Sequence, residues 1–367
     1  MKGLEMKRIS QRCFLFSVVL VTGMTVHGES VVGYYIGAKA HSLTRVDNWK
    51  DSIRPGRFNE GGVTNGAYGG TMIFDDQATG WGTRLTSTEL VSISNMIFSG
   101  SSAVTFTVPD YNKVRFESGG RLEVAADSGK TLSFNTGARL LINDVTQVGQ
   151  YVEIVNHAAG TPLLLGSLGN TQTSSENLYP EFRFSGEGDI VLHQSSDFPN
   201  GWSCAANGSL AVLVLNQTGV FRHAGQHDTF VDALIVPPSD TARRIELTTK
   251  NMILRRLQNR GAALAVSADT LITGSAGLDF GRFNYDFSKI SVAQGKTLTL
   301  DVATLRTSYE GASKGIWFEG KGTTVLTDAV KNLAEGFHKS CGEADFLFGD
   351  DRRHSEGAQE EEDNDNE

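Results

Sequence analysis

Cysteine and proline are scarce in this chain, which has 3 cysteines and 7 prolines among 367 residues. Cys13 belongs to the first segment of the chain, so only Cys204 and Cys341 remain beyond it, far apart in the sequence. A disulfide framework needs more cysteines than two, and a proline-rich stalk needs more prolines. The fold must therefore be stabilised by the burial of apolar side chains.

Long apolar runs and long helical patterns are also missing. After residue 28, no segment approaches the roughly 20 apolar residues that a membrane-spanning helix needs. Residues 245–257 are ambiguous, and residues 328–337 have apolar side chains at helical spacing. A doubly wound α/β fold needs a helix between successive strands, so the sequence excludes it and leaves a sandwich, a barrel or a solenoid.

Residues 1–28 have the pattern of a secretory signal peptide. Four basic residues and one acidic residue lie in residues 1–12, and an apolar run extends from Cys13 to Met24. Residues 26–28 then have the pattern of a small-residue cleavage site. The alternative is a membrane anchor, but the run is shorter than the roughly 20 residues needed to span a bilayer. We expect a cleaved signal, and no transmembrane segment after its removal.

The negative charge of the chain lies in its last residues. Residues 343–367 contain 11 acidic and 2 basic residues, and their net charge of −9 equals that of the whole chain. The acidity therefore does not indicate what the folded body binds. A segment of this composition cannot bury a core, so residues 328–367 are predicted to form a short helix and a disordered acidic tail.

Glycine is abundant, with 41 residues, and from 95 to 327 it separates short runs of alternating apolar residues. The template Phe-x-Gly-x-Gly-x-x-Val-Leu occurs at 184–192 and again at 318–326. Such recurrence is typical of repeat architectures, in which each unit buries its apolar face against its neighbours. The scarcity of Asn-Gly hairpin turns favours a parallel β-helix of about a dozen coils of about 20 to 25 residues. A stack of β-sandwiches is the alternative, and the irregular residues 29–94 are predicted to form an N-terminal cap.

Several strings resemble one family. Asn48-Trp49 is followed by a Gly-rich loop, by Thr71-Met-Ile-Phe-Asp, and then by Ile93-Ser-Asn-Met-Ile-Phe-Ser-Gly and Val104-Thr-Phe-Thr-Val. This order resembles the start of bacterial proteins with autotransporter-associated β-strand repeats, and Phe318-Glu-Gly-Lys-Gly-Thr-Thr-Val-Leu is similar to their repeat signature. The resemblance covers residues 49–327. It implies an all-β, right-handed parallel β-helix that is secreted or displayed on the bacterial cell surface.

The chain departs from that family after Thr327. The family continues with further repeats, whereas here an Asp-Ala-Val-Lys-Asn-Leu-Ala stretch and the acidic tail follow. The strands of a C-terminal membrane barrel are not found. We therefore expect a short secreted relative that does not export itself. A truncated fragment of a larger autotransporter-like surface protein is the alternative.

Two kinds of glycine motif imitate catalytic or nucleotide sites. Gly129-Lys-Thr and Gly295-Lys-Thr lack the earlier glycine of a phosphate-binding loop, and each continues into a strand instead of a helix. Gly311-Ala-Ser-Lys-Gly matches a nucleophile elbow, with Asp328 and His338 after it, but the sheet backed by helices that an elbow needs is absent. These strings predict turns, and no cofactor is expected.

Two clusters of titratable residues are candidate sites. His223, His227 and Asp228 have a spacing that binds zinc on a helix, but Gly225 between them favours a turn. Asp75-Asp76 is a carboxylate pair, yet adjacent strand residues point to opposite faces. We predict no catalytic residue and no metal site. A β-helical polysaccharide lyase or glycoside hydrolase is the alternative.

A basic stretch at 243–260 is the remaining candidate, because Glu246 is its only acidic residue. It offers a surface for an anionic glycan or polymer, with a plain solvated face as the alternative. It lacks aromatic stacking residues, which argues against nucleic acid. The sequence thus predicts a structural, adhesive or binding protein whose partners are extracellular glycans or other surface proteins. The basic residues are Arg243, Arg244, Lys250, Arg255, Arg256 and Arg260.

Overall fold

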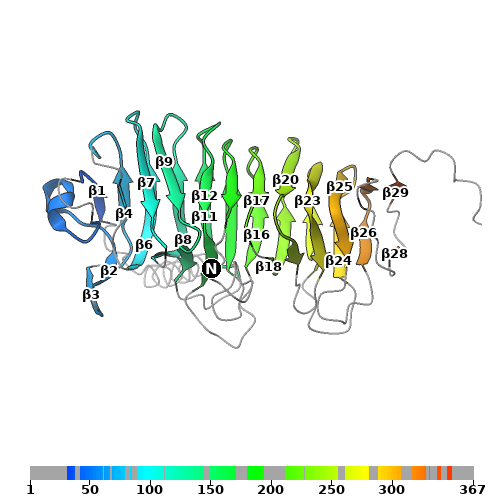
Figure 1. Ribbon diagram of the computed structural model, residues 1–367, viewed down its shortest axis with the longest axis horizontal. Helices are drawn as coiled ribbons and strands as arrows, with labels where there is room; N and C mark the ends of the chain where they lie inside the picture. Colours follow the sequence, from blue (N-terminus) through cyan, green and yellow to red (C-terminus); the bar gives the residue numbers. More distant parts are fainter. Residues whose placement is uncertain are drawn as a thin grey trace, which may run out of the picture.

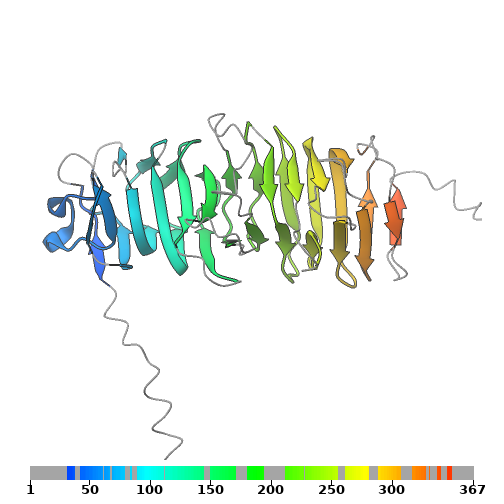
Figure 2. The ribbon, with the colours of Figure 1, turned by 90° about the horizontal axis from the view of Figure 1, so that it is seen from below.

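The chain winds into a long tube of stacked parallel β-strands (Figures 1 and 2). The predicted all-β parallel β-helix is therefore confirmed. Within the described residues the strands form two sheets, of 16 and 13 strands. The computed structural model describes residues 31–37, 42–60, 62–66, 68–78, 83–84, 89–110, 112–143, 149–170, 180–193, 211–226, 228–254, 261–280, 288–306, 316–327, 330, 337–339 and 345–348.

The first face of the tube is one continuous parallel ladder. Each of its strands pairs with the equivalent strand of the next coil rather than with its neighbour in sequence. In order along the tube, the strands are β1 (Val32–Tyr34), β4 (Thr71–Phe74), β6 (Glu89–Phe98), β8 (Lys113–Val124), β11 (Tyr151–Asn156), β14 (Glu181–Ser185), β16 (Val212–Leu215), β19 (Ala233–Val236), β22 (Leu264–Val266), β24 (Ser288–Val292), β26 (Ile316–Gly320) and β28 (Phe337–Lys339).

The second face is a parallel ladder of the same kind. Its strands follow those of the first face after a short turn. They are β5 (Thr83–Arg84), β7 (Val104–Val108), β9 (Lys130–Phe134), β12 (Leu163–Leu165), β15 (Ile190–Leu192), β17 (Phe221–His223), β20 (Arg243–Leu247), β23 (Thr270–Phe280), β25 (Thr297–Arg306), β27 (Thr323–Leu326) and β29 (Asp345–Phe348).

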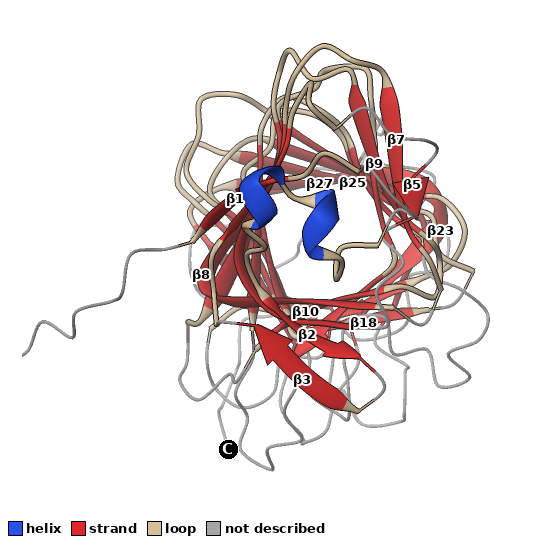
Figure 3. Cartoon of the chain, turned by 90° about the vertical axis from the view of Figure 1, so that its left-hand side faces the viewer, coloured by secondary structure: helices blue, strands red, loops and turns tan. Residues whose placement is uncertain are grey.

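A third side closes the tube, as the view along its axis shows (Figure 3). Four of the described strands, β6, β8, β23 and β25, bend around a corner to reach it, as β8 and β23 illustrate. Residues 113–116 of β8 pair with β10, whereas residues 120–124 pair with β11. Likewise, residues 278–280 of β23 pair with β21 on the third side. The remaining strands of this side are β2 (Arg57–Glu60), β3 (Val63–Gly66), β10 (Arg139–Ile142), β13 (Ser167–Asn170), β18 (Thr229–Val231) and β21 (Met252–Leu254).

Some coils are longer than the sequence predicts. Thr71 and Asn95 are register partners 24 positions apart, within the predicted period. Arg121 and Glu153 lie on paired strands 32 positions apart, well beyond it. The difference arises because a coil has three sides and connecting segments of unequal length. The connecting segments decide the length, since Val212 and Ala233 are register partners only 21 positions apart although β18 of the third side lies between them.

The interior consists of apolar side chains that alternate with outward-facing residues. Strand β14 has Phe182 and Phe184 fully buried and the residues between and beside them half-buried, as period-2 alternation requires. Because register is kept from coil to coil, like side chains stack. The rings of Phe74 and Phe98 lie 4.5 Å apart and nearly parallel, with Phe106 packed edge-on at 5.0 Å.

The glycines of the repeated Phe-x-Gly template mark turns where two coils approach closely. Gly186 and Gly320 have φ of 101° and 102°, which side-chain-bearing residues rarely adopt. A Cβ at either position would also lie 2.1 Å from a backbone oxygen of the preceding coil. The two template copies therefore resemble each other because the same corner is built twice.

Carboxylate and amide side chains join the corners of neighbouring coils. Asp189 accepts a hydrogen bond from the backbone N–H of Val220 at 2.9 Å, and Asp269 accepts one from Thr297 at 2.8 Å. Asn156 donates to the backbone oxygen of Asp189, also at 2.9 Å. Such bonds satisfy backbone groups at turns, where the ladder does not.

The two ends of the tube differ from its middle. The N-terminal end has two 3-10 turns, η1 (Val46–Asn48) and η2 (Lys50–Ser52), and an antiparallel pair of β2 with β3 (Figure 1). Parallel pairing nevertheless already includes β1 and β4, inside the segment assigned to a cap. At the other end, β28 and β29 extend the ladder beyond Thr327, so Phe337 lies in a strand rather than a helix. The signal-peptide residues and most of the acidic tail lie outside the described residues.

Candidate functional site

Charged side chains gather on the outer surface of the first face, on β8, β11 and β14. Strand register brings them together: Arg121 is the partner of Glu153, and Glu153 is the partner of Arg183. All three point away from the core, because they alternate with buried residues. The result is a row of alternating sign that crosses three coils.

Ion pairs fix most of this row. Arg121 donates to Glu123 at 2.6 Å and to Glu153 at 3.0 Å. Although burial alone lowers the pKa of Arg121, its hydrogen bonds and the charges of both glutamates raise the pKa above its usual value. Exposed pairs of this kind contribute at most about 1 kcal/mol to stability, so their value lies in orienting side chains.

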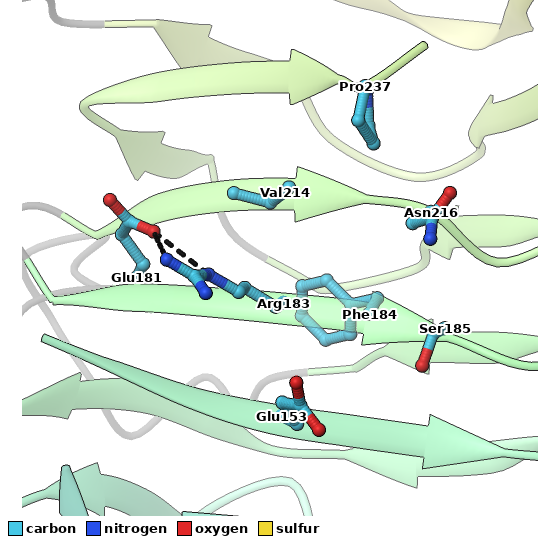
Figure 4. Close-up of a pocket in the computed structure, with 8 residues that line it drawn as sticks. All are labelled: Glu153, Glu181, Arg183, Phe184, Ser185, Val214, Asn216 and Pro237. Atoms are coloured by element: carbon cyan, nitrogen blue, oxygen red, sulfur yellow. Dashed lines mark hydrogen bonds and ion pairs between the residues drawn. The ribbon is translucent and has the colours of Figure 1, made fainter. Parts of the chain in front are cut away.

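Arg183 lies between a ring and a carboxylate. Its guanidinium carbon is 3.6 Å from the centroid of the Tyr151 ring, and two of its nitrogens donate to Oε2 of Glu181, at 3.0 and 2.8 Å (Figure 4). A planar guanidinium makes both contacts at once. This pair of contacts holds Arg183 flat against the sheet beside Glu153.

Beside Arg183 there is a groove of about 400 Å³. Figure 4 shows that it extends from Glu153 on β11 across β14 to Val214 on β16, with Asn216 just beyond β16 and Pro237 just beyond β19. Polar and apolar groups both line it. The lining residues are Glu153, Glu181, Arg183, Phe184, Ser185, Val214, Asn216 and Pro237.

The groove offers acceptors, donors and an apolar wall. Both hydrogen bonds from Arg183 go to one oxygen of Glu181, and Glu153 uses one oxygen for Arg121, so each carboxylate has further acceptor capacity. Ser185 adds a hydroxyl. The amide oxygen of Asn216 accepts from Arg243 at 3.1 Å, which leaves its amide nitrogen as a donor. Polar groups placed on an apolar wall are typical of small-ligand sites.

The structure separates the predicted basic residues. Arg243 points inward and is only 5% exposed; it donates to Asn216, to Ser239 at 2.9 Å and to the backbone of Thr241. Burial lowers the pKa of Arg243. Arg243 is therefore not available to a solvent-borne anion. The prediction missed this because it counted charges without applying strand alternation.

The other basic residues have different surroundings. Arg244 faces outward next to Arg243 and pairs with Glu246 at 2.8 Å, and Lys250 is exposed in the turn after β20. Glu246 also pairs with Arg222 at 2.7 Å, so the outer charge is partly neutralised. Arg255, Arg256 and Arg260 lie outside the described residues.

The histidine cluster does not form a metal site in the part of the chain that is described. His223 is buried, and its Nε2 hydrogen-bonds the hydroxyl of Thr229. Burial lowers the pKa of His223 to about 4, so it is neutral at physiological pH. Asp228 instead accepts from the backbone of Asn251 at 3.1 Å. His227 lies outside the described residues, among which no group of three potential metal ligands is found.

The carboxylate pair and the lysines of the Gly-Lys-Thr strings form hydrogen bonds with backbone groups at the turns between strands. Asp75 accepts from the backbone of Gln77 and Asp76 from that of Ser102, both at 2.8 Å. The amine of Lys130 donates to the backbone oxygen of Ser102 at 3.3 Å, and that of Lys296 to Ser239 at 3.0 Å. In both strings the lysine therefore contacts backbone of an earlier coil. Ser313 and Asp328 of the elbow-like string lie outside the described residues.

Sequence reasoning did not find the groove, because its residues form no local motif. Glu153, Arg183 and Val214 are successive register partners, but each lies on a different coil. Only a correct coil length would have aligned them. Within each strand, the alternation of apolar and polar residues does show which residues of β11 and β14 point outward.

Comparisons with protein-family models, with curated protein sequences and with solved structures found no match. The geometry of the groove and of the tube is therefore the basis for assigning a function. Among the described residues, no helix has the length and apolar character needed to cross a membrane.

Proposed function

We propose that the protein is an exported β-solenoid that binds glycans in the groove on its first face and does not alter them chemically. The supporting observation is the groove itself, in which two carboxylates, a hydroxyl and an amide donor lie beside Val214 and Pro237. Sugars present hydroxyls on their edges and apolar C–H faces. Hydroxyls suit carboxylate and amide partners, and C–H faces suit an apolar wall.

The charge of the groove favours a neutral or amino-bearing glycan over an anionic one. Glu153 and Glu181 line the groove with one arginine, Arg183, which Glu181 already engages. Arg121 beside the groove is shared between Glu153 and Glu123, so these five side chains keep one more negative than positive charge. An anionic sugar would meet two carboxylates and one neutralised cation. This preference is opposite to that expected of the basic stretch at 243–260.

Export and surface display belong to the same proposal. The signal-like residues 1–28 and the resemblance to autotransporter-associated repeat proteins motivate them. A parallel β-helix suits such a role, because a long tube exposes wide outer faces that vary without disturbing the core. Detection of the mature chain in the culture medium or on intact cells, with residues 1–28 removed, tests this part.

A β-helical glycoside hydrolase is the second candidate, because the groove has two carboxylates. Hydrolysis needs one carboxyl that donates a proton to the leaving oxygen. Both Glu153 and Glu181 instead accept hydrogen bonds from arginines. We therefore expect no new reducing ends when neutral polysaccharides are incubated with the purified protein. Their appearance, and its loss in Glu153→Gln, would establish the enzyme.

The binding test uses calorimetric titration with neutral, amino-bearing and anionic oligosaccharides. We expect binding of the first two classes, and Glu153→Gln weakens it about ten-fold, because a charge-assisted hydrogen bond contributes about 1.5 kcal/mol. The exposed fraction of Glu153 is 39%, so the change leaves folding nearly intact.

Glu319 provides a matched control. It occupies the outer surface of the same face, on β26, is 30% exposed and pairs with Lys289 at 3.3 Å. Glu319→Gln removes the same charge from an equivalent setting, far along the tube, and should leave affinity unchanged. Equal losses in both variants, or tighter binding of the anionic oligosaccharide, would contradict the proposal.

A further inference from the structure

One end of the first-face groove carries a hydrogen-bond donor at a defined place in the strand register. Asn216 follows β16, and its backbone N–H donates to the oxygen of Phe184 at 2.8 Å. Because Phe184 is the register partner of Leu215, Asn216 lies beside Ser185 of the preceding coil. By the same register, Pro237 lies beside Asn216 on the following coil. Ser185, Asn216 and Pro237 therefore form a row across this end of the groove.

A buried cation fixes the orientation of the Asn216 amide. Arg243 is 5% exposed, and one of its terminal nitrogens donates to the amide oxygen of Asn216 at 3.1 Å. The guanidinium is held in turn by the hydroxyl of Ser239 and the backbone oxygen of Thr241. A reversed amide would turn its own N–H groups against those of the guanidinium. The amide nitrogen therefore stays on the side of Ser185, as Figure 4 shows, and is the donor that this end offers.

Apolar groups lie beside this donor. Val214 precedes Asn216 by two positions, so both side chains point to the same face of the sheet, with Cα atoms about 6.6 Å apart. Val214 is half-buried on the outer surface, and the ring of Pro237 lines the groove as well. A carbonyl that accepts from the Asn216 nitrogen can thus place a small apolar substituent against this wall. This end of the groove fits a group that has both parts.

The substituents that sugars carry fit this end unequally. A hydroxyl can accept from Asn216, but it brings no apolar surface to the wall. An ammonium group has only donors and would meet another donor. A carboxylate accepts, but it also lacks an apolar part and adds negative charge to a groove that holds Glu153 and Glu181. An acetamido group has a carbonyl oxygen, a methyl group and no charge.

We infer that this end of the groove binds the acetamido group of an N-acetylated amino sugar. The carbonyl oxygen accepts a hydrogen bond from the amide nitrogen of Asn216, and the methyl group packs against Val214 and Pro237. Arg243 contributes by holding the amide of Asn216 and does not touch the sugar. The inference rests on the proposed glycan function and specifies which sugar the groove selects.

Calorimetric titration of the purified protein with two neutral oligosaccharides tests this inference. The β-1,4-linked tetramers of N-acetylglucosamine and of glucose have equal length and linkage, and they differ only in the substituent at C2. We expect the N-acetylated tetramer to bind about ten-fold more tightly, because it gains one hydrogen bond and buries one methyl group.

Asn216→Asp removes the donor and keeps the contact with Arg243. The carboxylate still accepts from the guanidinium, but it has no N–H for the acetamido carbonyl. The preference for the N-acetylated tetramer should fall to about two-fold or less, while affinity for the glucose tetramer should change by less than about two-fold. Asn216 is exposed, so the variant should fold normally.

Asn65→Asp is the matched control, because it makes the same change at an exposed residue of β3, at the N-terminal end of the tube. It should leave the preference unchanged. Equal binding of the two tetramers by the unmodified protein, or a full preference in Asn216→Asp, would overturn the inference and leave the glycan proposal standing. Binding of neither tetramer would overturn both.

Discussion

The inward and outward positions of the first face follow different rules, although they alternate along the same strands. Inward, the register series from Met72 through Leu122 to Phe184 is apolar and fully buried in every coil. Outward, the adjacent series changes from Arg121 to Glu153, Arg183 and then Val214. The inward series repeats from coil to coil, and the outward series does not.

This difference separates the residues that make the fold from those available for recognition. An inward side chain stacks on its equivalents above and below, so a change in size affects three coils at once. An outward side chain contacts few neighbours, and most substitutions there are nearly neutral. A groove can therefore arise on the outer surface without altering the tube.

The largest expected effect is the loss of an inward ring. Phe184→Ala removes a side chain with 0% exposure from the middle of the tube and should destabilise the protein by about 3 to 5 kcal/mol in urea unfolding. Its outward neighbour provides the comparison. Arg183→Ala should cost no more than about 1 kcal/mol. Similar costs for the two variants would mean that the outer row is as important to stability as the core.

Asp279 is an exception to the rule that outward residues are exposed. Strand alternation places it outward, yet it is 0% exposed, and Arg306 donates to both its oxygens at 2.9 Å. Burial raises the pKa of Asp279, and the hydrogen bonds of Arg306 oppose this. Arg306→Leu should cost about 3 kcal/mol at neutral pH, the lower end for a broken buried pair, since Arg306 is partly exposed.

The pH dependence of the same variant has a definite sign. Without Arg306 the pKa of Asp279 rises further above that of the unfolded chain, so the deficit should shrink as the pH is lowered and the carboxyl binds a proton. Arg244→Leu is the control, because Glu246 keeps its contact with Arg222 at 2.7 Å. It should cost less than about 1 kcal/mol at any pH. A deficit in Arg306→Leu that grows on acidification would contradict this assignment.

The stability of the protein in acid tests the burial of His223, an inward-facing residue. Because burial lowers its pKa to about 4, the unfolded chain binds more protons than the folded one between pH 6.5 and 4. The contribution of His223 to the free energy of unfolding is fully present above pH 6.5 and should fall by about 3 kcal/mol as the pH approaches 4. His223→Gln should remove this share of the acid sensitivity in urea titrations. His157→Gln, at a half-buried surface position, should leave it in place.

The inward series explains why the fold was predictable from the sequence. Short alternating runs such as Val104–Val108 and glycines such as Gly320, which takes a left-handed corner, are local signals. Coil length was not predictable, because it depends on connecting segments and on a third side whose strands, such as Ser167–Asn170, have no distinct pattern. The groove depends on that length, so it escaped prediction with it.

The basic stretch at 243–260 shows the same limit of prediction from the sequence. Arg243 and Arg244 are neighbours in sequence, so a count of charges joins them, whereas the strand sends one inward and the other outward. Arg222 and Glu246 are 24 residues apart, and the register brings them to 2.7 Å. Charge on a solenoid must therefore be summed along the tube, across coils, and not along the chain.

The most direct test of the central claim is a crystal structure of the protein with a neutral or amino-bearing oligosaccharide. We predict that the sugar lies in the first-face groove, with hydroxyls on Glu153 and Ser185 and a C–H face against Val214, while the coils keep their register. A sugar bound instead along the second face beside Arg244 and Lys250, or an empty groove at saturating ligand, would contradict the account.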